Sequence, residues 1–370
     1  MKEEKQYWLA LNRVKQIGSV RFKALIESFG NAKSAWEASE SALRATGLGP
    51  KIVSNLIKLR ETYDFDSLIT DLKVHNVRAI TWEDADYPNR LREINQSPPV
   101  IYLRGDLIDK DDWAIAVVGT RKMTRYGHQI ADELGIYLAN QGITVVSGLA
   151  HGIDAATQQA AIQAGGRSIA VLAHGLDNIY PARNQQLGLS IEKNGALVSD
   201  YALGTPADAS NFPPRNRIIA ALARATVVIE AGQRSGALIT ARFAVEQGRD
   251  VFAVPGSIYG DQSKGPNQLI RDGAHPLLHF DQLLEALDLE FMQQQQSARK
   301  SLPKDAIQAK LYGIMSPEPM HVNEIGNLAE MPIDKVSSAL ALMELKGMVR
   351  QVGGMNYVLV RELRAPYGAS

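Results

Sequence analysis

The chain contains no cysteine, which excludes disulfide bonds, thiolate metal sites and a cysteine nucleophile. No apolar run reaches the roughly 18 residues of a membrane-spanning helix, and the first residues lack the apolar core of a signal peptide. We therefore expect a cytoplasmic protein without membrane contact. Net charge is also absent, since 40 Lys and Arg balance 40 Asp and Glu. Binding of a polyanion would have to come from a local group of cations.

The composition is that of an ordinary folded protein, with 45% hydrophobic and 22% charged residues in a chain of 370. This length is enough for two or three domains. Residues 291–302 are polar and rich in glutamine, which predicts a flexible linker. We divide the rest into residues 1–80, 81–290 and 303–362.

The central part alternates short apolar segments with helix-length segments, which is typical of a parallel sheet. The expected strands are 114–118, 144–147, 168–172, 196–198, 226–230 and 250–254. The expected helices are 127–141, 153–164, 184–193, 217–224 and 237–247. The pattern predicts an α/β fold with a Rossmann-like, doubly wound, mostly parallel sheet. Loops after parallel strands meet at one sheet edge, where such folds bind ligands.

The two flanking parts are expected to be smaller domains. Residues 1–80 contain two glycine turns, Gln16–Ser19 and Thr46–Pro50, each followed by a helical apolar pattern, which resembles a helix-hairpin-helix or SAM-like domain. A packing bundle is the alternative interpretation. Residues 303–362 show three helical segments and a hairpin, which resemble a winged helix. Its presumptive recognition helix offers only Lys335 and Lys346 as cations, so weak duplex binding or protein docking is expected there.

The region 211–242 combines features that suit a phosphate-containing polymer. Arginines and an asparagine follow Phe212, and a Gly-Ser turn precedes the next helix. Helix N-termini and glycine-rich loops offer unpaired N–H groups to anions, arginine pairs with phosphates, and an aromatic ring can stack on a base. Two structural alternatives stay open, in which Phe212 lies in the core and Arg217 pairs with Glu230.

Three enzyme classes fit the residues poorly. The loop after the first strand lacks the G-x-G-x-x-G pattern of dinucleotide binding. The segment Gly232–Gly236 has the spacing G-x-x-S-G, not that of a nucleophile elbow, so Ser235 is expected to cap a helix. A phosphoribohydrolase-type enzyme needs a carboxylate just beyond its phosphate loop, whereas the next one here is Glu246. We therefore predict no catalytic residues and no cofactor.

A metal site is not expected either. His275 and His279 are four residues apart, but Pro276 lies between them and indicates a strand at the edge of the sheet. His151, in a glycine-rich loop, suits a ligand contact and a structural role equally well.

The central region resembles the DNA-processing protein A family (DprA, also called Smf). The similarity rests on motifs found in order along the chain, namely Val117–Arg121, Ser147–Asp154, Gly175–Asp177, Tyr180-Pro181 with Asn184, Phe212-Pro213 with Arg215–Ala220, Glu230-Ala231, Ser235–Ala241 and Ala253–Ser257. The sequence departs from the family pattern at Ala173-His174, Thr157-Gln158, Asp200 and Pro266.

The resemblance implies a non-enzymatic protein that binds single-stranded DNA during natural transformation and loads the RecA recombinase onto it, commonly as a homodimer. It implies little sequence preference and contacts mainly to the phosphate backbone. An enzyme acting on nucleotides and an assembly adaptor are the alternatives. The residues expected to contact DNA are Arg121, Gly148, Arg183, Phe212, Arg215, Asn216, Arg217, Ser235 and Gly236.

Overall fold

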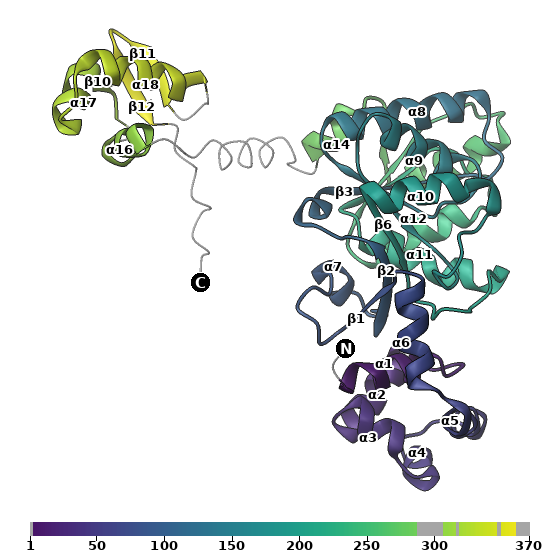
Figure 1. The fold of residues 1–370 in the computed structure, drawn as a ribbon. Coiled ribbons are helices and arrows are strands. Elements are labelled where there is room, and N and C mark those ends of the chain that lie inside the picture. Colours follow the sequence, from purple (N-terminus) through teal and green to yellow (C-terminus); the bar gives the residue numbers. More distant parts are fainter. Residues whose placement is uncertain (1–2, 287–305, 316–317, 346–348, 360–370) are drawn as a thin grey trace. The chain divides into compact units, whose positions relative to one another are not determined.

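The computed structural model describes residues 3–286, 306–315, 318–345 and 349–359. It divides into two compact units, Met1–Phe280 and Asp281–Ser370 (Figure 1). The linker predicted at residues 291–302 lies outside the described residues. No described helix is both long and apolar enough to cross a bilayer.

The first unit begins with a group of six helices. They are α1 (Glu3–Asn12), α2 (Ser19–Phe29), α3 (Ala32–Glu37), α4 (Glu40–Ala45), α5 (Pro50–Thr62) and α6 (Phe65–Val74). The two glycine turns lie where helices meet: Gly18 precedes α2 and Gly49 precedes α5. Pro50 occupies the first turn of α5, where its missing N–H costs no helical hydrogen bond. The helical pattern of this part is thus confirmed.

The remainder of the first unit is built on one mixed sheet of nine strands, in the order β1-β2-β6-β5-β4-β3-β7-β8-β9. From β6 to β9 all neighbours are parallel, whereas β1 and β2 are antiparallel additions at one edge. The strands are β1 (Arg78–Thr81), β2 (Val100–Gly105), β3 (Ala114–Val118), β4 (Thr144–Ser147), β5 (Ser168–Val171), β6 (Gly195–Ser199), β7 (Ala225–Val228), β8 (Asp250–Ala253) and β9 (His275–Pro276).

Helices cover both faces of this sheet (Figure 1). They are α7 (Asn89–Arg92), α8 (Arg125–Asn140), α9 (Ile153–Gln163), α10 (Gln185–Asn194), α11 (Phe212–Ala221), α12 (Gly236–Glu246) and α13 (Lys264–Arg271). Four short 3-10 helices join them, η1 (Asp109–Trp113), η2 (Ala182–Asn184), η3 (Ala209–Asn211) and η4 (Asp261–Ser263). The predicted Rossmann-like α/β fold is confirmed.

Alternation along the strands assigns side chains to two separate cores. In β2, Tyr102 packs with the N-terminal helices and α10, while Ile101 packs with residues of α11 and α12. Every residue of β3 is buried, as expected for a parallel strand covered on both faces. The N-terminal helices therefore share a hydrophobic core with one face of the sheet, and a domain boundary at residue 80 stays a prediction.

The structure corrects two expectations in this unit. No strand was expected before residue 114, but β1 and β2 lie there, and β2 pairs with β6, so this segment belongs to the sheet. The helix expected to start at Arg217 starts at Phe212, because Pro213 and Pro214 occupy its first turn. Arg215, Asn216 and Arg217 therefore lie in a helix and are buried.

The second unit contains α14 (Asp281–Ala286), α16 (Ala306–Ile314), α17 (Val322–Ala329) and α18 (Ile333–Leu345), with the strands β10 (Met320–His321), β11 (Val349–Gly353) and β12 (Asn356–Leu359). The strands form a small sheet in the order β10-β12-β11. The core beneath it includes Ile325, Leu340 and Met343. The helices α16, α17 and α18, followed by the β11–β12 hairpin, confirm the winged-helix prediction.

Candidate nucleic-acid interface

A groove of about 710 Å³ lies at the carboxyl ends of β3 and β7. The loop after β3, the first turns of α11 and the turn before α12 form its walls. Six of the residues expected to contact DNA line it, namely Arg121, Phe212, Arg215, Asn216, Ser235 and Gly236. The structure therefore brings together residues that are up to 115 positions apart in the sequence.

Close packing of two glycine-containing loops forms one wall of the groove. Gly152 has φ +82°, and a side chain there would collide with the carbonyl oxygen of Thr120. A Cβ on Gly119 would lie 2.5 Å from Cγ1 of Ile153. The N–H of Ile153 also donates to the carbonyl oxygen of Thr120 at 3.2 Å. The loops after β3 and β4 are thus fixed against each other, and this contact positions Arg121.

Two guanidinium groups lie close to the ring of Phe212. The Cζ atom of Arg121 is 5.2 Å from the centre of the Phe212 ring, and that of Arg215 is 5.8 Å away. The ring is half-buried, so the structure does not place it in the closed core. The ring of Tyr180 lies 6.2 Å from it at an angle of 49° and is 49% exposed. Aromatic surface and cationic charge therefore meet at one point of the groove.

Arg215 is a buried cation, with only 3% of its surface exposed. Its Nη1 donates to the carbonyl oxygens of Gly148, at 3.1 Å, and Val171. Burial lowers the pKa of Arg215 to about 10, and the carboxylate of Asp154 opposes this shift. Burial raises the pKa of Asp154 in turn, and Arg215 opposes that shift. Arg215 remains charged at neutral pH, and its burial reduces the screening of that charge by solvent.

The start of α12 forms the opposite wall. The hydroxyl of Ser235 accepts the N–H of Ala237 at 3.3 Å, so Ser235 caps the helix as predicted. The amide of Asn216 donates to the carbonyl oxygen of Gly236 at 3.1 Å and accepts from Nε of Arg215 at 3.2 Å. Asn216 thereby holds the N–H-rich end of α12 next to the buried cation.

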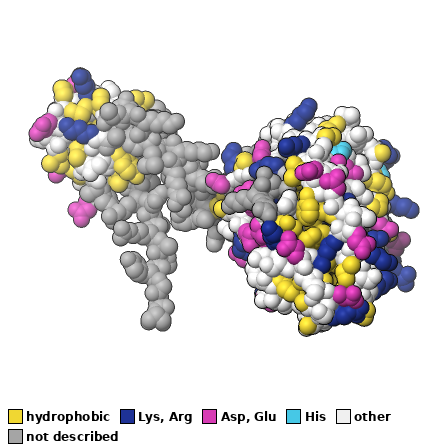
Figure 2. Space-filling view, turned by 60° about the horizontal axis from the view of Figure 1, so that its bottom comes forward, with side chains coloured by type: hydrophobic (Ala, Val, Ile, Leu, Met, Phe, Trp, Pro, Cys, Tyr) yellow, Lys and Arg dark blue, Asp and Glu magenta, His cyan; other side chains and the backbone are white. Residues whose placement is uncertain are grey.

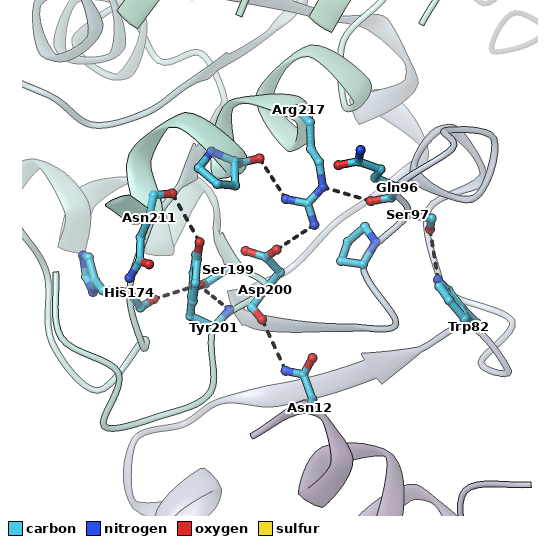
Figure 3. Close-up of polar contacts among 12 residues, drawn as sticks. Asn12, Trp82, Gln96, Ser97, His174, Ser199, Asp200, Tyr201, Asn211 and Arg217 are labelled. Carbon is cyan, nitrogen blue, oxygen red and sulfur yellow. Dashed lines mark hydrogen bonds and ion pairs between the residues drawn. The ribbon is translucent and has the colours of Figure 1, made fainter. Parts of the chain in front are cut away.

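Arg217 points away from the groove into a network of protein acceptors (Figure 3). Its Nη2 pairs with Asp200 at 2.8 Å, and its Nε donates to the carbonyl oxygen of Gln96 at 2.9 Å. The alternative in which Arg217 pairs with Glu230 is wrong, because the carboxylate of Glu230 accepts from the N–H and the hydroxyl of Thr124. Arg217 is therefore not part of the groove.

Two other expected contact residues lie outside the groove wall. Arg183 is exposed on η2 and does not line the groove. Gly148 is buried, its N–H donates to Asp154 at 3.1 Å, and its carbonyl accepts from Arg215. A Cβ on Gly148 would lie 2.8 Å from Nη2 of Arg215. Gly148 thus makes room for the buried cation, and its N–H is already used within the protein.

Sequence reasoning missed two residues of this site. Asp154 was noted only within a motif, although a carboxylate in the first turn after a glycine loop is a recognisable signal. Tyr180 was also noted only within a motif, yet its ring lies beside that of Phe212. An aromatic residue in a turn carries no sequence signal for the neighbour that it meets.

Charges of both signs are mixed over the face of the first unit seen in Figure 2. This mixture agrees with the equal numbers of positively and negatively charged residues in the sequence. The groove differs from this mixed surface, because the guanidinium groups of Arg121 and Arg215 both lie near the ring of Phe212.

Three family models match this chain. The model for DNA recombination-mediator protein A matches residues 78–288, the DprA winged helix domain matches 295–355, and the DprA-like N-terminal HHH domain matches 2–55. The chain belongs to the DprA/Smf family. Curated relatives agree with this assignment over nearly the whole length. Protein Smf of Synechocystis is 34% identical over 96% of this chain and 98% of its own. Protein Smf of Escherichia coli is 35% identical over 88% and 90%.

Solved structures show the same fold. DNA processing protein A (DprA) from Streptococcus pneumoniae is similar with a TM-score of 0.67 and 32% identity, over 77% of this chain and 98% of that chain. The DNA processing protein A from Helicobacter pylori has a TM-score of 0.53 and 28% identity, over 58% and 98%. That structure was reported for its single-stranded DNA binding mode.

Proposed function

We propose that this chain binds single-stranded DNA in the groove at the carboxyl ends of β3 and β7, mainly through the phosphate backbone. The placement of the Phe212 ring beside the guanidinium groups of Arg121 and Arg215 is the observation that carries the proposal. A base stacked on the ring would bring its phosphate within reach of a cation. Membership of the DprA/Smf family and the Helicobacter pylori relative support the same ligand.

The groove suits an unpaired strand better than a duplex. Stacking on Phe212 requires a base with a free face, which a paired and stacked base does not offer. The donors in the groove are guanidinium groups and amides at a helix end, which bind phosphates without reading base edges. Binding with little sequence preference follows.

Fluorescence anisotropy with a labelled oligothymidylate tests the proposal. Affinity should exceed that for a duplex of equal length and should fall with salt, with a slope of about −0.7 per neutralised phosphate. Arg121→Ala should flatten that slope by about 0.7. Arg242→Ala is the matched control, because Arg242 is an exposed arginine on α12 outside the groove wall. Equal effects of the two substitutions would place the strand elsewhere.

We further propose that the chain has no catalytic activity. Glu246, the first carboxylate after the Gly-Ser turn, lines a pocket away from the groove. Asp154 does line the groove, but its carboxylate accepts the N–H of Gly148. A nucleotide hydrolase is still the alternative to test, because burial raises the pKa of Asp154 and favours its acid form. Release of base from a nucleotide panel, abolished by Asp154→Asn, would replace the binding protein with an enzyme.

The remaining proposals concern partners. We propose that the protein acts in the cytoplasm during natural transformation, works as a homodimer and loads the RecA recombinase onto the bound strand. Light scattering measures the dimer directly. A truncation ending near Leu289 separates the roles of the two units: it should retain strand binding. If strand binding is lost while recombinase contact persists, the chain is an assembly adaptor.

A further inference from the structure

A second group of arginines lies at the opposite edge of the sheet from the groove. Arg224 directly precedes β7 and Arg249 directly precedes β8, its parallel neighbour. Both therefore lie at the amino ends of the strands, whereas the groove lies at the carboxyl ends. Arg90, on α7, meets them from outside the sheet. We call these three residues the arginine cluster.

Contacts show that the guanidinium groups converge. The carbonyl oxygen of Asp112 accepts from Nε of Arg224 at 2.8 Å and from Nη2 of Arg90 at 3.4 Å. The Cζ atom of Arg224 also lies 4.2 Å from the centre of the Trp113 ring. Nη2 of Arg249 pairs with Glu93 at 3.0 Å. Two of the three cations thus share one neutral acceptor.

The cluster has more donors than the protein satisfies. In the part of the chain that the structure describes, no carboxylate lies within ion-pair distance of Arg90 or Arg224. Nε of Arg90 and Nε of Arg249 are buried and have no partner among the same residues. The pKa of Arg90 is lowered first by burial and then by the charges of Arg224 and Arg249, while the charges of Asp112 and Glu93 oppose this shift. Unpaired buried donors beside like charges call for an explanation, and a bound anion supplies one.

We propose that Arg90, Arg224 and Arg249 bind a phosphate group at this edge of the sheet. Guanidinium forks match the oxygens of a phosphate and bind it with two parallel hydrogen bonds. Neither Nη atom of Arg224 has an acceptor among the described residues, so both are available as donors. The phosphate is either free or part of a polynucleotide backbone, since both present the same oxygens.

Glu93 competes with the bound anion. Its side chain is 64% exposed and is the carboxylate that pairs with Arg249. A pocket of about 280 Å³ opens beside these two residues. Neutralising Glu93 would release Arg249 for the phosphate and remove a repulsive charge. If the arginine cluster has only a structural role, neutralising Glu93 breaks its pair with Arg249 and brings no gain in phosphate binding.

Tryptophan fluorescence of the full chain tests the site, because Arg224 covers Trp113. Sodium phosphate, titrated at constant ionic strength against sodium chloride, should change the emission in a saturable way. Trp113→Phe should remove this change. Arg224→Gln and Arg249→Gln should weaken binding about tenfold or more, since each removes charge-assisted hydrogen bonds. Arg242→Gln is the control and should bind like the parent.

Glu93→Gln gives a result in the opposite direction and does not depend on the stability of the arginine variants. It should bind phosphate more tightly than the parent. An oligothymidylate that produces the same Trp113 response identifies the ligand as a polynucleotide backbone, whereas a response to inorganic phosphate alone identifies a free phosphate. The absence of a saturable response to either ligand in both the parent and Glu93→Gln would overturn the proposal.

Discussion

Replacing Phe212 by alanine should weaken single-strand binding without a change in overall charge. The ring lies within 6 Å of the guanidinium carbons of Arg121 and Arg215 and is half-buried, so part of it is open to a base. Stacking of one base on an aromatic ring contributes about 1–3 kcal/mol. The dissociation constant should therefore rise about five- to 150-fold.

Anisotropy at fixed salt measures this change. The slope of affinity against salt should stay near that of the parent, because no cation is removed. Phe212→Leu separates stacking from packing, since leucine fills the space without offering a flat ring. Tyr259→Ala is the control, because Tyr259 is 90% exposed and does not line the groove. An affinity within twofold of the parent, in a folded Phe212→Ala protein, would refute stacking at this position.

Three further substitutions test how the site is supported. Arg217→Ala breaks the pair with Asp200, whose side chains are 10% and 13% exposed. We expect a loss of about 3–5 kcal/mol in the free energy of unfolding, measured with urea. The strand affinity of the folded protein should change little. Burial lowers the pKa of His174 from its usual 6.5, so the unfolded chain binds the proton more readily and stability falls as the pH drops below 6.5. His174→Gln should remove that part of the fall in thermal melts, and an unchanged pH profile would contradict the assignment. Gly152→Ala should lower the melting temperature, because φ is +82° and the added Cβ meets the carbonyl oxygen of Thr120, at a cost of about 1–2 kcal/mol from conformation alone.

Much of the sheet could be predicted from sequence because its strands are buried on both faces. In β3 every residue is apolar and buried, so an uninterrupted apolar run marks the strand at its true ends. In β4, which is also buried throughout, Val145 and Val146 mark the strand between the polar residues Thr144 and Ser147. The antiparallel β2 was missed because two prolines precede it and one of its two pairing partners, β6, is almost a hundred residues away. Local pattern holds no information about such a partner.

The site was predicted in outline and missed in its details. Topology alone brings Arg121 and Ser235 to one edge, and the structure places both in the groove wall. The positions of Arg215 and Arg217 differ from the prediction. The helix starts at Phe212 and not at Arg217, so the two side chains lie on opposite sides of α11. A shift of five residues in the helix start thus decides which arginine faces the groove.

Cross-linking of an unpaired strand tests the central claim most directly. An oligodeoxynucleotide with photoreactive 5-iododeoxyuridine is irradiated with the full chain, and the attached peptides are identified by mass spectrometry. The account predicts attachment at Phe212 and at its neighbour Tyr180, lost when duplex replaces the single strand. Attachment confined to the winged helix, or equal attachment from duplex, would contradict it.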